Sequence, residues 1–412
     1  MNELFSIRRW HALGLLVITG GLLGCPGGDL TWREPPEIAS KIAVVGHSAS
    51  ASTEATGDPI APPVPDEAAT RAQAAAALGG TAPAIDGAAL RRRVAEVLRA
   101  GREERQLSVD THAAWQVMHG VLAYGREFRI QTPAGAEPAV TYALEGGPLK
   151  GFVIRGGDRF ETPTGTLRGL VAELDPGQKI GQGHRDQWLA YLARCELNDS
   201  DLIQSADGPL TLEGWIRQVE WDVPRNFEGE YSWTLTGLLK HRPTTHSWIA
   251  RDGQRYSIES LLSSEMSQLA PTNACGGSHR LCAIATAVAA RRQEGLPMTG
   301  VWSDAEDLLQ DAVEQVQQFQ NADGTFSSRY FDRPGWSLDL AASLGTTGHA
   351  FEFLMVAASD DLLREPWVNR AAAAICEILE KTADVDLECG ALYHALSGLV
   401  LYDQRTAKLT SL

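Results

Sequence analysis

The chain has 412 residues, enough for one large domain or two ordinary ones, and 44% of them are hydrophobic. Its net charge of -16 argues against a nucleic-acid partner, because phosphate binding needs clustered Lys and Arg. The same charge argues against adhesion to anionic lipid, so a membrane contact would need an anchor. The six cysteines do not have the spacing of a small disulfide-stapled domain.

The N-terminal residues have the pattern of a secretory signal. Two arginines precede an apolar run that is shorter than the ~20 residues needed to span a bilayer. Residues 22–25 (LLGC) resemble the bacterial lipobox, whose cysteine is lipidated and becomes the new N-terminus. Leu23 stands where that motif usually has a small residue, so ordinary signal cleavage stays open, as does a plain anchor helix. We expect a lipoprotein-type signal over residues 1–25, with lipidation of Cys25.

The signal predicts an extracytoplasmic protein that is attached to a membrane of the cell envelope. Residues 26–84 are rich in Ala, Pro, Ser, Thr and Gly and have few aromatic residues. Such a stretch buries too little apolar surface to offset its chain entropy, so we expect a disordered tether. The folded domain is predicted over residues 85–405.

Most of this domain has a helical pattern, with apolar residues at three- and four-residue spacing. The predicted helices are 88–100, 110–124, 184–194, 211–221, 231–240, 258–269, 277–292, 304–319, 348–358, 365–381 and 388–402. Helices that are apolar on every side alternate with helices that have one polar face, and the former are expected to be buried. This alternation predicts a mainly α protein with two concentric rings of helices, an α/α toroid. A helical solenoid is the alternative.

Residues 135–182 are the exception to the helical pattern. They are rich in Gly, Thr and β-branched residues, as in residues 139–144 (AVTYAL) and 151–157 (GFVIRGG), with turn residues between the runs. We expect two or three short strands here, forming a small β flap against one mouth of the helical body.

One motif carries a resemblance to a known fold. Residues 320–326 (QNADGTF) resemble the glutamine-tryptophan motif of squalene-hopene cyclases, with Phe326 in place of the usual Trp. The resemblance implies the α/α toroid of terpenoid cyclases, protein prenyltransferase β subunits and complement thioester domains over roughly residues 85–405. The activity signatures of these families are missing, since there is no DxDD acid and residues 274–277 (ACGG) do not match the thioester motif GCGEQ. The resemblance therefore implies a fold and no activity.

A second resemblance concerns residues 348–354 (GHAFEFL). They resemble the G-H-x-x-E-aromatic stretch of the N-acylglucosamine 2-epimerase family, also α/α barrels, whose histidine transfers a proton at a sugar carbon. The resemblance implies such a role for His349. Glu352 follows one turn later in an apolar helix, where a carboxylate is costly unless it has a partner. Its two interpretations are a catalytic acid and a structural network with an Arg or backbone amides.

Histidines recur near the starts of the predicted buried helices. In a toroid these starts gather at one mouth, which predicts a polar ligand-binding mouth. The residues are His112, His184, His279, His349 and His394. A helix N-terminus disfavours imidazolium and leaves a neutral base or ligand. The alternative for each histidine is an ordinary packing or capping role.

Two classes of function fit this mouth. The first, slightly favoured by the missing signatures, is a non-catalytic module that binds a glycan or an envelope protein. The second is a carbohydrate-active enzyme of epimerase, lyase or hydrolase type, with His349 or His184 as base and Glu352 or Asp186 as acid. Tyr191 near Asp186 suits stacking on a sugar ring. No cofactor is specified by the sequence.

Two cysteines precede histidines in similar settings. Cys275 is followed by His279 on one helix face, where the pair could bind zinc or form a thiolate–imidazole pair, and Cys389 is followed by His394. No C-x-x-C or H-E-x-x-H motif supplies further ligands, so no metal site is predicted. The other interpretations are packing cysteines and a Cys275–Cys389 disulfide, which an extracytoplasmic location permits.

Overall fold

The computed structural model describes residues 86–226 and 230–410. The predicted signal, Cys25 and the predicted tether lie outside these residues. The described residues belong to one compact unit, which runs from Pro65 to Leu412. Within them, no helix has both the length and the apolar character needed to cross a membrane.

The described part of the chain is mainly helical, as the sequence predicted. Its α-helices are α2 (Gly87–Glu103), α3 (Ala114–Tyr124), α4 (Ala139–Leu144), α5 (Gln187–Leu192), α6 (Leu212–Asp222), α7 (Ser232–Leu239), α8 (Ile258–Ser267), α9 (Ser278–Gln293), α10 (Val301–Gln318), α11 (Leu340–Ala357), α12 (Pro366–Lys381) and α13 (Cys389–Thr410). α11 begins before the predicted residue 348, because the Asp339 side chain caps it by accepting hydrogen bonds from the backbone N–H groups of Ala341 and Ala342.

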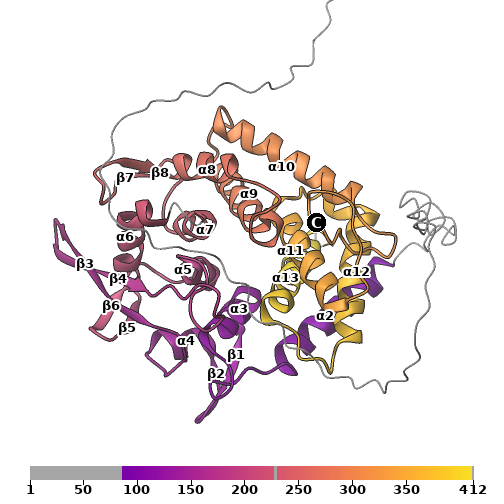
Figure 1. Ribbon diagram of the computed structural model, residues 1–412, viewed down its shortest axis with the longest axis horizontal. Helices are drawn as coiled ribbons and strands as arrows, with labels where there is room; N and C mark the ends of the chain where they lie inside the picture. The colour runs from indigo at the N-terminus through magenta and orange to yellow at the C-terminus, as the bar shows by residue number, and fades with distance from the viewer. Residues whose placement is uncertain (1–85, 227–229, 411–412) are drawn as a thin grey trace, which may run out of the picture. The chain divides into compact units, whose positions relative to one another are not determined.

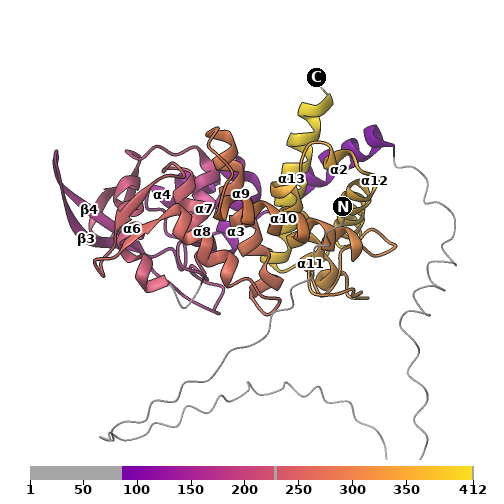
Figure 2. The same ribbon diagram turned by 90° about the horizontal axis from the view of Figure 1, so that it is seen from above.

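Six buried helices lie side by side in succession. α3 contacts α5, α5 contacts α7, and the series continues through α9, α11 and α13, which contacts α3 again. Figure 1 shows these helices in the same order. Further helices pack on them: α8 contacts α7 and α9, α10 contacts α9 and α11, and α12 contacts α11 as well as α2. Figure 2 shows α2 and α12 at the opposite end of the unit from β3 and β4.

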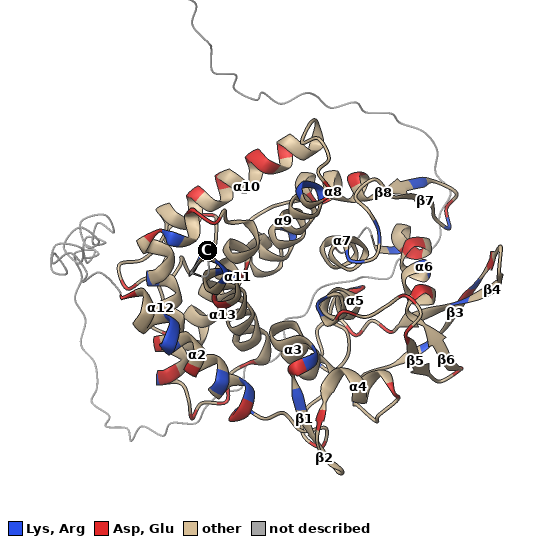
Figure 3. Cartoon of the chain, turned by 180° about the vertical axis from the view of Figure 1, so that it is seen from behind, with Lys and Arg blue, Asp and Glu red and all other residues tan. Residues whose placement is uncertain are grey.

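α10 shows how the sequence produces an outer helix. Its buried residues, among them Trp302, Ala305, Leu309, Val313 and Val316, recur every three or four positions and form one apolar stripe. The carboxylates lie on the other side and are visible along α10 in Figure 3. By contrast, α11 is buried along most of its length.

The strands form four two-stranded antiparallel hairpins in the described residues. They are β1 (Arg129–Thr132) with β2 (Gly135–Pro138), β3 (Ile154–Thr162) with β4 (Gly165–Ala172), β5 (Leu202–Ser205) with β6 (Gly208–Thr211), and β7 (Ser247–Ile249) with β8 (Arg255–Ser257). The predicted flap corresponds to β2, β3 and β4. β3 and β4 pack on α6, where the backbone N–H of Asp158 on β3 donates to the side-chain oxygen of Gln218 at 2.7 Å.

Residues 139–144, expected as a strand, form α4 instead. Ala139, Val140, Ala143 and Leu144 are buried. Their spacing of one, three and one places them on one face of a helix, whereas a strand would send Ala139 and Val140 to opposite faces. The hairpins β5–β6 and β7–β8 were not predicted.

Gln320 and Phe326, the residues of the cyclase-like motif, join α10 to α12. The Gln320 side-chain amide donates to the carbonyl of Trp367 at 2.9 Å and to that of Gly324 at 3.0 Å. Phe326 is buried edge-on against the Trp367 ring, with 6.2 Å between ring centroids. The motif therefore attaches the turn after α10 to the start of α12.

Candidate functional site

Five histidine rings form an unbroken series among the buried helices. Their centroids are separated by 5.3 Å (His184–His279), 5.7 Å (His279–His349), 4.0 Å (His349–His394) and 5.7 Å (His394–His119). The last four residues are buried on α9, α11, α13 and α3, while His184 precedes α5 and is partly exposed. We call these five residues the histidine cluster. Four of them were predicted to meet, and His119 was not among the predicted site residues.

Cys275 lies beside the cluster, in a left-handed turn that leads into α9. Its φ of 49° is followed by positive φ values of 63° and 85° at Gly276 and Gly277. Residues other than glycine seldom adopt this region, so the Cys-Gly-Gly run suits the turn. A Cβ on Gly276 would lie 2.4 Å from the Tyr330 ring, so the glycine also allows Tyr330 to approach. The thiol is thereby fixed at the positive end of α9.

The ligand atoms of Cys275, His279 and His349 all lie within 4.8 Å of one another. Burial alone would raise the pKa of the Cys275 thiol, but the imidazoles of His349 and His279 lower it to about 4. Burial disfavours the imidazolium of His279, whereas Glu230 and Cys275 favour it and raise its pKa to about 10. The three side chains thus place one thiol beside two imidazoles.

Glu230 is a buried carboxylate shared by two histidines. Its Oε1 lies 3.2 Å from Nδ1 of His279 and 3.4 Å from Nδ1 of His184. Burial would raise the pKa of Glu230, yet His279 and His184 lower it to about 2. The line Glu230–His279–Cys275 therefore has the order of an orienting acid, a base and a thiol.

Glu352 joins α11 to α13 and to the turn after α5 through a buried network. It accepts hydrogen bonds from His394 Nδ1 at 2.6 Å, Ser397 Oγ at 2.6 Å and the Arg194 guanidinium at 3.2 Å. Burial would raise its pKa, but His394 and Arg194 hold it below the ordinary value. This is the structural network with an Arg that the sequence left open. Its histidine partner is His394 rather than His349, whose Nδ1 faces the Gly345 carbonyl at 2.7 Å.

His394 is held as a neutral imidazole. Burial, followed by the nearby His349, lowers its pKa to about 4 despite the contact with Glu352. On the other side of the cluster, the Tyr191 hydroxyl lies 3.2 Å from Nε2 of His119 and accepts a hydrogen bond from Gln187 at 2.9 Å. Tyr191, predicted as a ligand contact, is buried against the cluster through His119.

Two predicted site residues, His112 and Asp186, lie apart from the cluster. α3 begins at Ala114, so His112 stands in the preceding turn, where its Nδ1 accepts from the backbone N–H of Ser108 at 3.0 Å. The Asp186 carboxylate accepts from Thr234 at 2.6 Å, and no hydrogen bond found in the described residues joins it to a histidine of the cluster. Cys275 and Cys389 are free thiols, so the disulfide between them, one of the interpretations that the sequence left open, is not formed.

Aromatic rings border the histidine cluster. Trp115 lies 4.0 Å from His119, and Trp233 lies 4.8 Å from His279 and 5.8 Å from His184, measured between ring centroids. Trp115, His184 and Cys275 are only partly buried. These three residues of the site therefore contact solvent.

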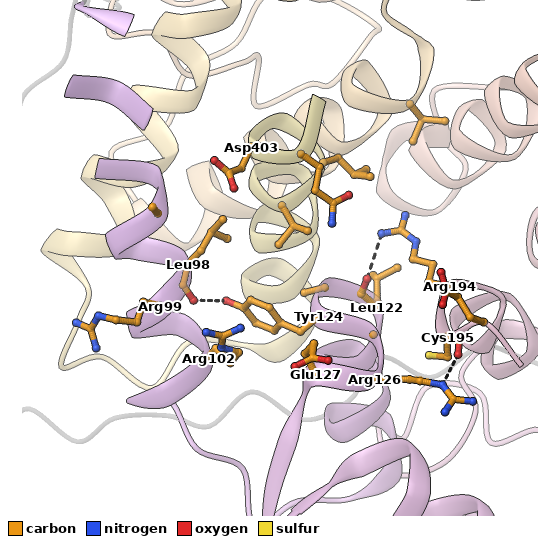
Figure 4. Close-up of a pocket in the computed structure, with 18 residues that line it drawn as sticks. Leu98, Arg99, Arg102, Leu122, Tyr124, Arg126, Glu127, Arg194, Cys195 and Asp403 are labelled. Atoms are coloured by element: carbon orange, nitrogen blue, oxygen red, sulfur yellow. Dashed lines mark hydrogen bonds between the residues drawn. The ribbon is translucent and has the colours of Figure 1, made fainter. Parts of the chain in front are cut away.

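A separate cavity of about 670 Å³ lies at the other ends of α3 and α5 (Figure 4). It is lined by Arg99, Arg102 and Arg126 and by Arg194, which also contacts Glu352. Arg126 and Arg194 donate to the carbonyls of Cys195 and Leu122, so they serve to satisfy helix ends. Arg194 therefore connects this cavity with the buried network of Glu352.

Comparison with protein-family models found no match, and comparison with curated proteins found none either.

Proposed function

We propose that residues 86–410 form an α/α toroid and that the histidine cluster at its centre is the active site of an extracytoplasmic enzyme. The proposed chemistry is acid–base catalysis on a polar ligand of the cell envelope, with glycans as the first class to test. The observation that carries the proposal is the series of five neighbouring histidine rings, from four buried helices and one loop, three of which contact one of two buried carboxylates.

The toroid is supported by the order of the helix contacts. The six buried helices contact one another in chain order, and the last one, α13, returns to the first, α3. An open solenoid would leave its first and last repeats apart, because each repeat contacts only its neighbours. The outer helices pack on the buried ones, as expected for a second layer.

An enzyme is favoured over a binding module by the contacts of the histidines. His184 and His279 lie within 3.4 Å of Glu230, and a third histidine of the cluster is bonded to Glu352. Imidazoles oriented by carboxylates are the usual donors and acceptors of protons in catalysis.

His394 is the candidate general base. Glu352 accepts a hydrogen bond from its Nδ1, which leaves Nε2 as the basic nitrogen, and Arg194 and Ser397 hold the carboxylate in place. Trp115, which is only partly buried and lies beside His119, is the tryptophan on which a sugar ring can stack.

The test is a screen of envelope oligosaccharides with the purified full chain and its His394→Gln variant. We expect wild type to convert at least one glycan and the variant to lose about 10²- to 10⁴-fold in rate, since that is the usual contribution of a general base. Because Arg194 and Ser397 still pair with Glu352, the variant should keep most of its melting temperature.

His112→Gln is the matched control, because His112 lies outside the cluster and should have no effect on turnover. If wild type binds a glycan and converts none of the panel, the chain is a binding module and the enzyme proposal fails. Equal rates for wild type and His394→Gln would remove His394 from the mechanism.

A further inference from the structure

We infer that Cys275, His279 and His349 form a binding site for one divalent transition metal of the zinc class. The inference deepens the proposed function, because it adds a Lewis acid beside the proposed base His394. The three ligand atoms come from the turn before α9, from α9 itself and from α11, and all lie within 4.8 Å of one another. A metal ion about 2.0–2.3 Å from each atom requires such convergence.

The second coordination shell is already in place. A metal-binding histidine usually donates its other ring N–H to a carboxylate or a backbone carbonyl, which fixes the tautomer and orients the ring. Nδ1 of His279 faces Glu230 at 3.2 Å, and Nδ1 of His349 faces the Gly345 carbonyl at 2.7 Å. Both rings are therefore held so that Nε2 is the nitrogen left to bind a metal.

One of these nitrogens is an unsatisfied buried polar atom. Nε2 of His279 is buried and has no hydrogen-bond partner in the described part of the chain, although His279 is only 7% exposed. Leaving such an atom unpaired costs about 1–3 kcal/mol, so a partner for it is expected. A metal held with Cys275 and His349 would supply that partner.

The donor set selects the kind of metal. A thiolate with two imidazoles suits zinc, whereas calcium and magnesium prefer oxygen ligands. Three protein ligands leave the fourth tetrahedral position open, which is the arrangement of catalytic rather than structural zinc sites. Cys275 is partly exposed, so the open position has access to solvent. A metal bound here would polarise a ligand oxygen close to His394, whose ring lies 4.0 Å from that of His349.

The experiment measures metal binding without any substrate. Full-length protein is stripped with chelator and titrated with Zn²⁺, and with Co²⁺ to observe the absorption of a cobalt–thiolate bond. We expect one metal per chain, loss of the cobalt–thiolate band in Cys275→Ser, and affinity reduced at least 10-fold in His349→Ala. Glu230→Gln keeps all three ligands and should weaken binding by about 10- to 100-fold, as second-shell changes do.

Cys389→Ser and His112→Ala are matched controls, because both residues lie outside the site and both variants should bind as wild type does. A second measurement uses wild type alone: bound Zn²⁺ should protect Cys275 from alkylation, followed by peptide mass mapping. Two results would overturn the inference: wild type that remains metal-free after the Zn²⁺ titration, and rapid alkylation of Cys275 whether or not Zn²⁺ is present. Either result would favour a thiolate nucleophile with His279 as its base.

These results are independent of the enzyme proposal. If no substrate is found, one metal per chain with the expected loss in Cys275→Ser still establishes the site. If metal binding fails while His394→Gln still abolishes turnover, only the metal inference is lost.

Discussion

At the scale of single residues, the partners of a buried carboxylate decide whether it can hold a charge. Glu352 has a guanidinium, an imidazole and a hydroxyl around it, and its pKa is lowered although it is buried. Asp186 is as deeply placed but has the Thr234 hydroxyl as its main partner, so burial raises its pKa to about 6. The two acids therefore affect stability in opposite directions as pH changes.

Asp186 predicts a pH-dependent stability. Its folded pKa lies above the ordinary 3.8, so the native state binds more protons than the unfolded state between about pH 4 and pH 6. The contribution of this group to stability is fully present below about pH 4 and is lost as pH rises through about 6. Asp186→Asn removes this dependence, and the variant should gain on wild type by up to about 1.4 kcal/mol per pH unit across that window.

Urea denaturation of both proteins at several pH values from about 4 to 7 measures the difference. Asn also tolerates the left-handed backbone of Asp186, whose φ is 63°, so strain should not obscure the comparison. A stability difference that stays constant across this range would show that Asp186 titrates normally.

Some residues of the candidate site could be predicted from the sequence and others could not. Glu352 stood out as an acid in an apolar helix, and four histidines stood out by their places near the starts of apolar helices. His119 gave a weaker form of the same signal, as a polar residue within the buried stretch Ala114–Tyr124. Glu230 gave none, because a loop acid is ordinary in a sequence and only its contacts with His184 and His279 make it part of the site.

At the scale of helices, the approach of α11 to α13 positions the site. Gly348 on α11 lies against Ala395 on α13. Gly348 directly precedes His349 in the chain, and Ala395 directly follows His394, whose ring stacks on that of His349. A Cβ on Gly348 would lie 2.7 Å from the Ala395 Cβ and 2.8 Å from its Cα. The small residues therefore let the two imidazoles stack at 4.0 Å.

Gly348→Ala should destabilise the protein by about 1–3 kcal/mol, the usual cost of overpacking, and should weaken any ligand binding that uses both histidines. Gly345→Ala is the control on the same helix, because its Cβ would meet only the Ala391 Cβ at an ordinary 3.5 Å. That variant should be neutral or gain up to about 1 kcal/mol from helix propensity. Thermal melting of the two variants checks this, and equal melting temperatures would contradict the packing argument.

Secondary structure was predictable where one strong period extends over many residues. α10 and α12 have a clear apolar stripe, and both were found close to their predicted bounds. α11 was predicted too short because residues 340–347 are small and weakly patterned, and its cap at Asp339 decides its start. The short hairpins β5–β6 and β7–β8 contain only three or four residues per strand, too few to show an alternation.

At the scale of the whole molecule, the attachment of the domain to a membrane is the main untested prediction. We propose that Cys25 is lipidated, on the basis of the apolar run and the LLGC site. Wild type should then enter the detergent-rich phase of a phase-separation assay, and Cys25→Ala should move to the aqueous phase. Partition of wild type into the aqueous phase would show that the signal is cleaved without an anchor.

The architecture could be predicted only in part, because sequence patterns reveal which helices are buried and not which of them touch. The contact between α3 and α13, the first and last of the six buried helices, joins segments separated by most of the domain. No local sequence pattern predicts this contact. The same holds for the ion pair of Arg93 with Glu380, which ties α2 to α12 across 287 positions of the chain.

The contact between α3 and α13 has a consequence for how the protein matures. His119 lies on α3 and His394 on α13, so the two sides of the site belong to the first and the last parts of the domain to be synthesised. Contacts between such distant segments form slowly, since the intervening loop entropy must be overcome first. A chain whose synthesis is incomplete therefore has no complete histidine cluster. The cluster is completed only after α13, the last helix, has docked on α3, so its assembly belongs to the end of folding.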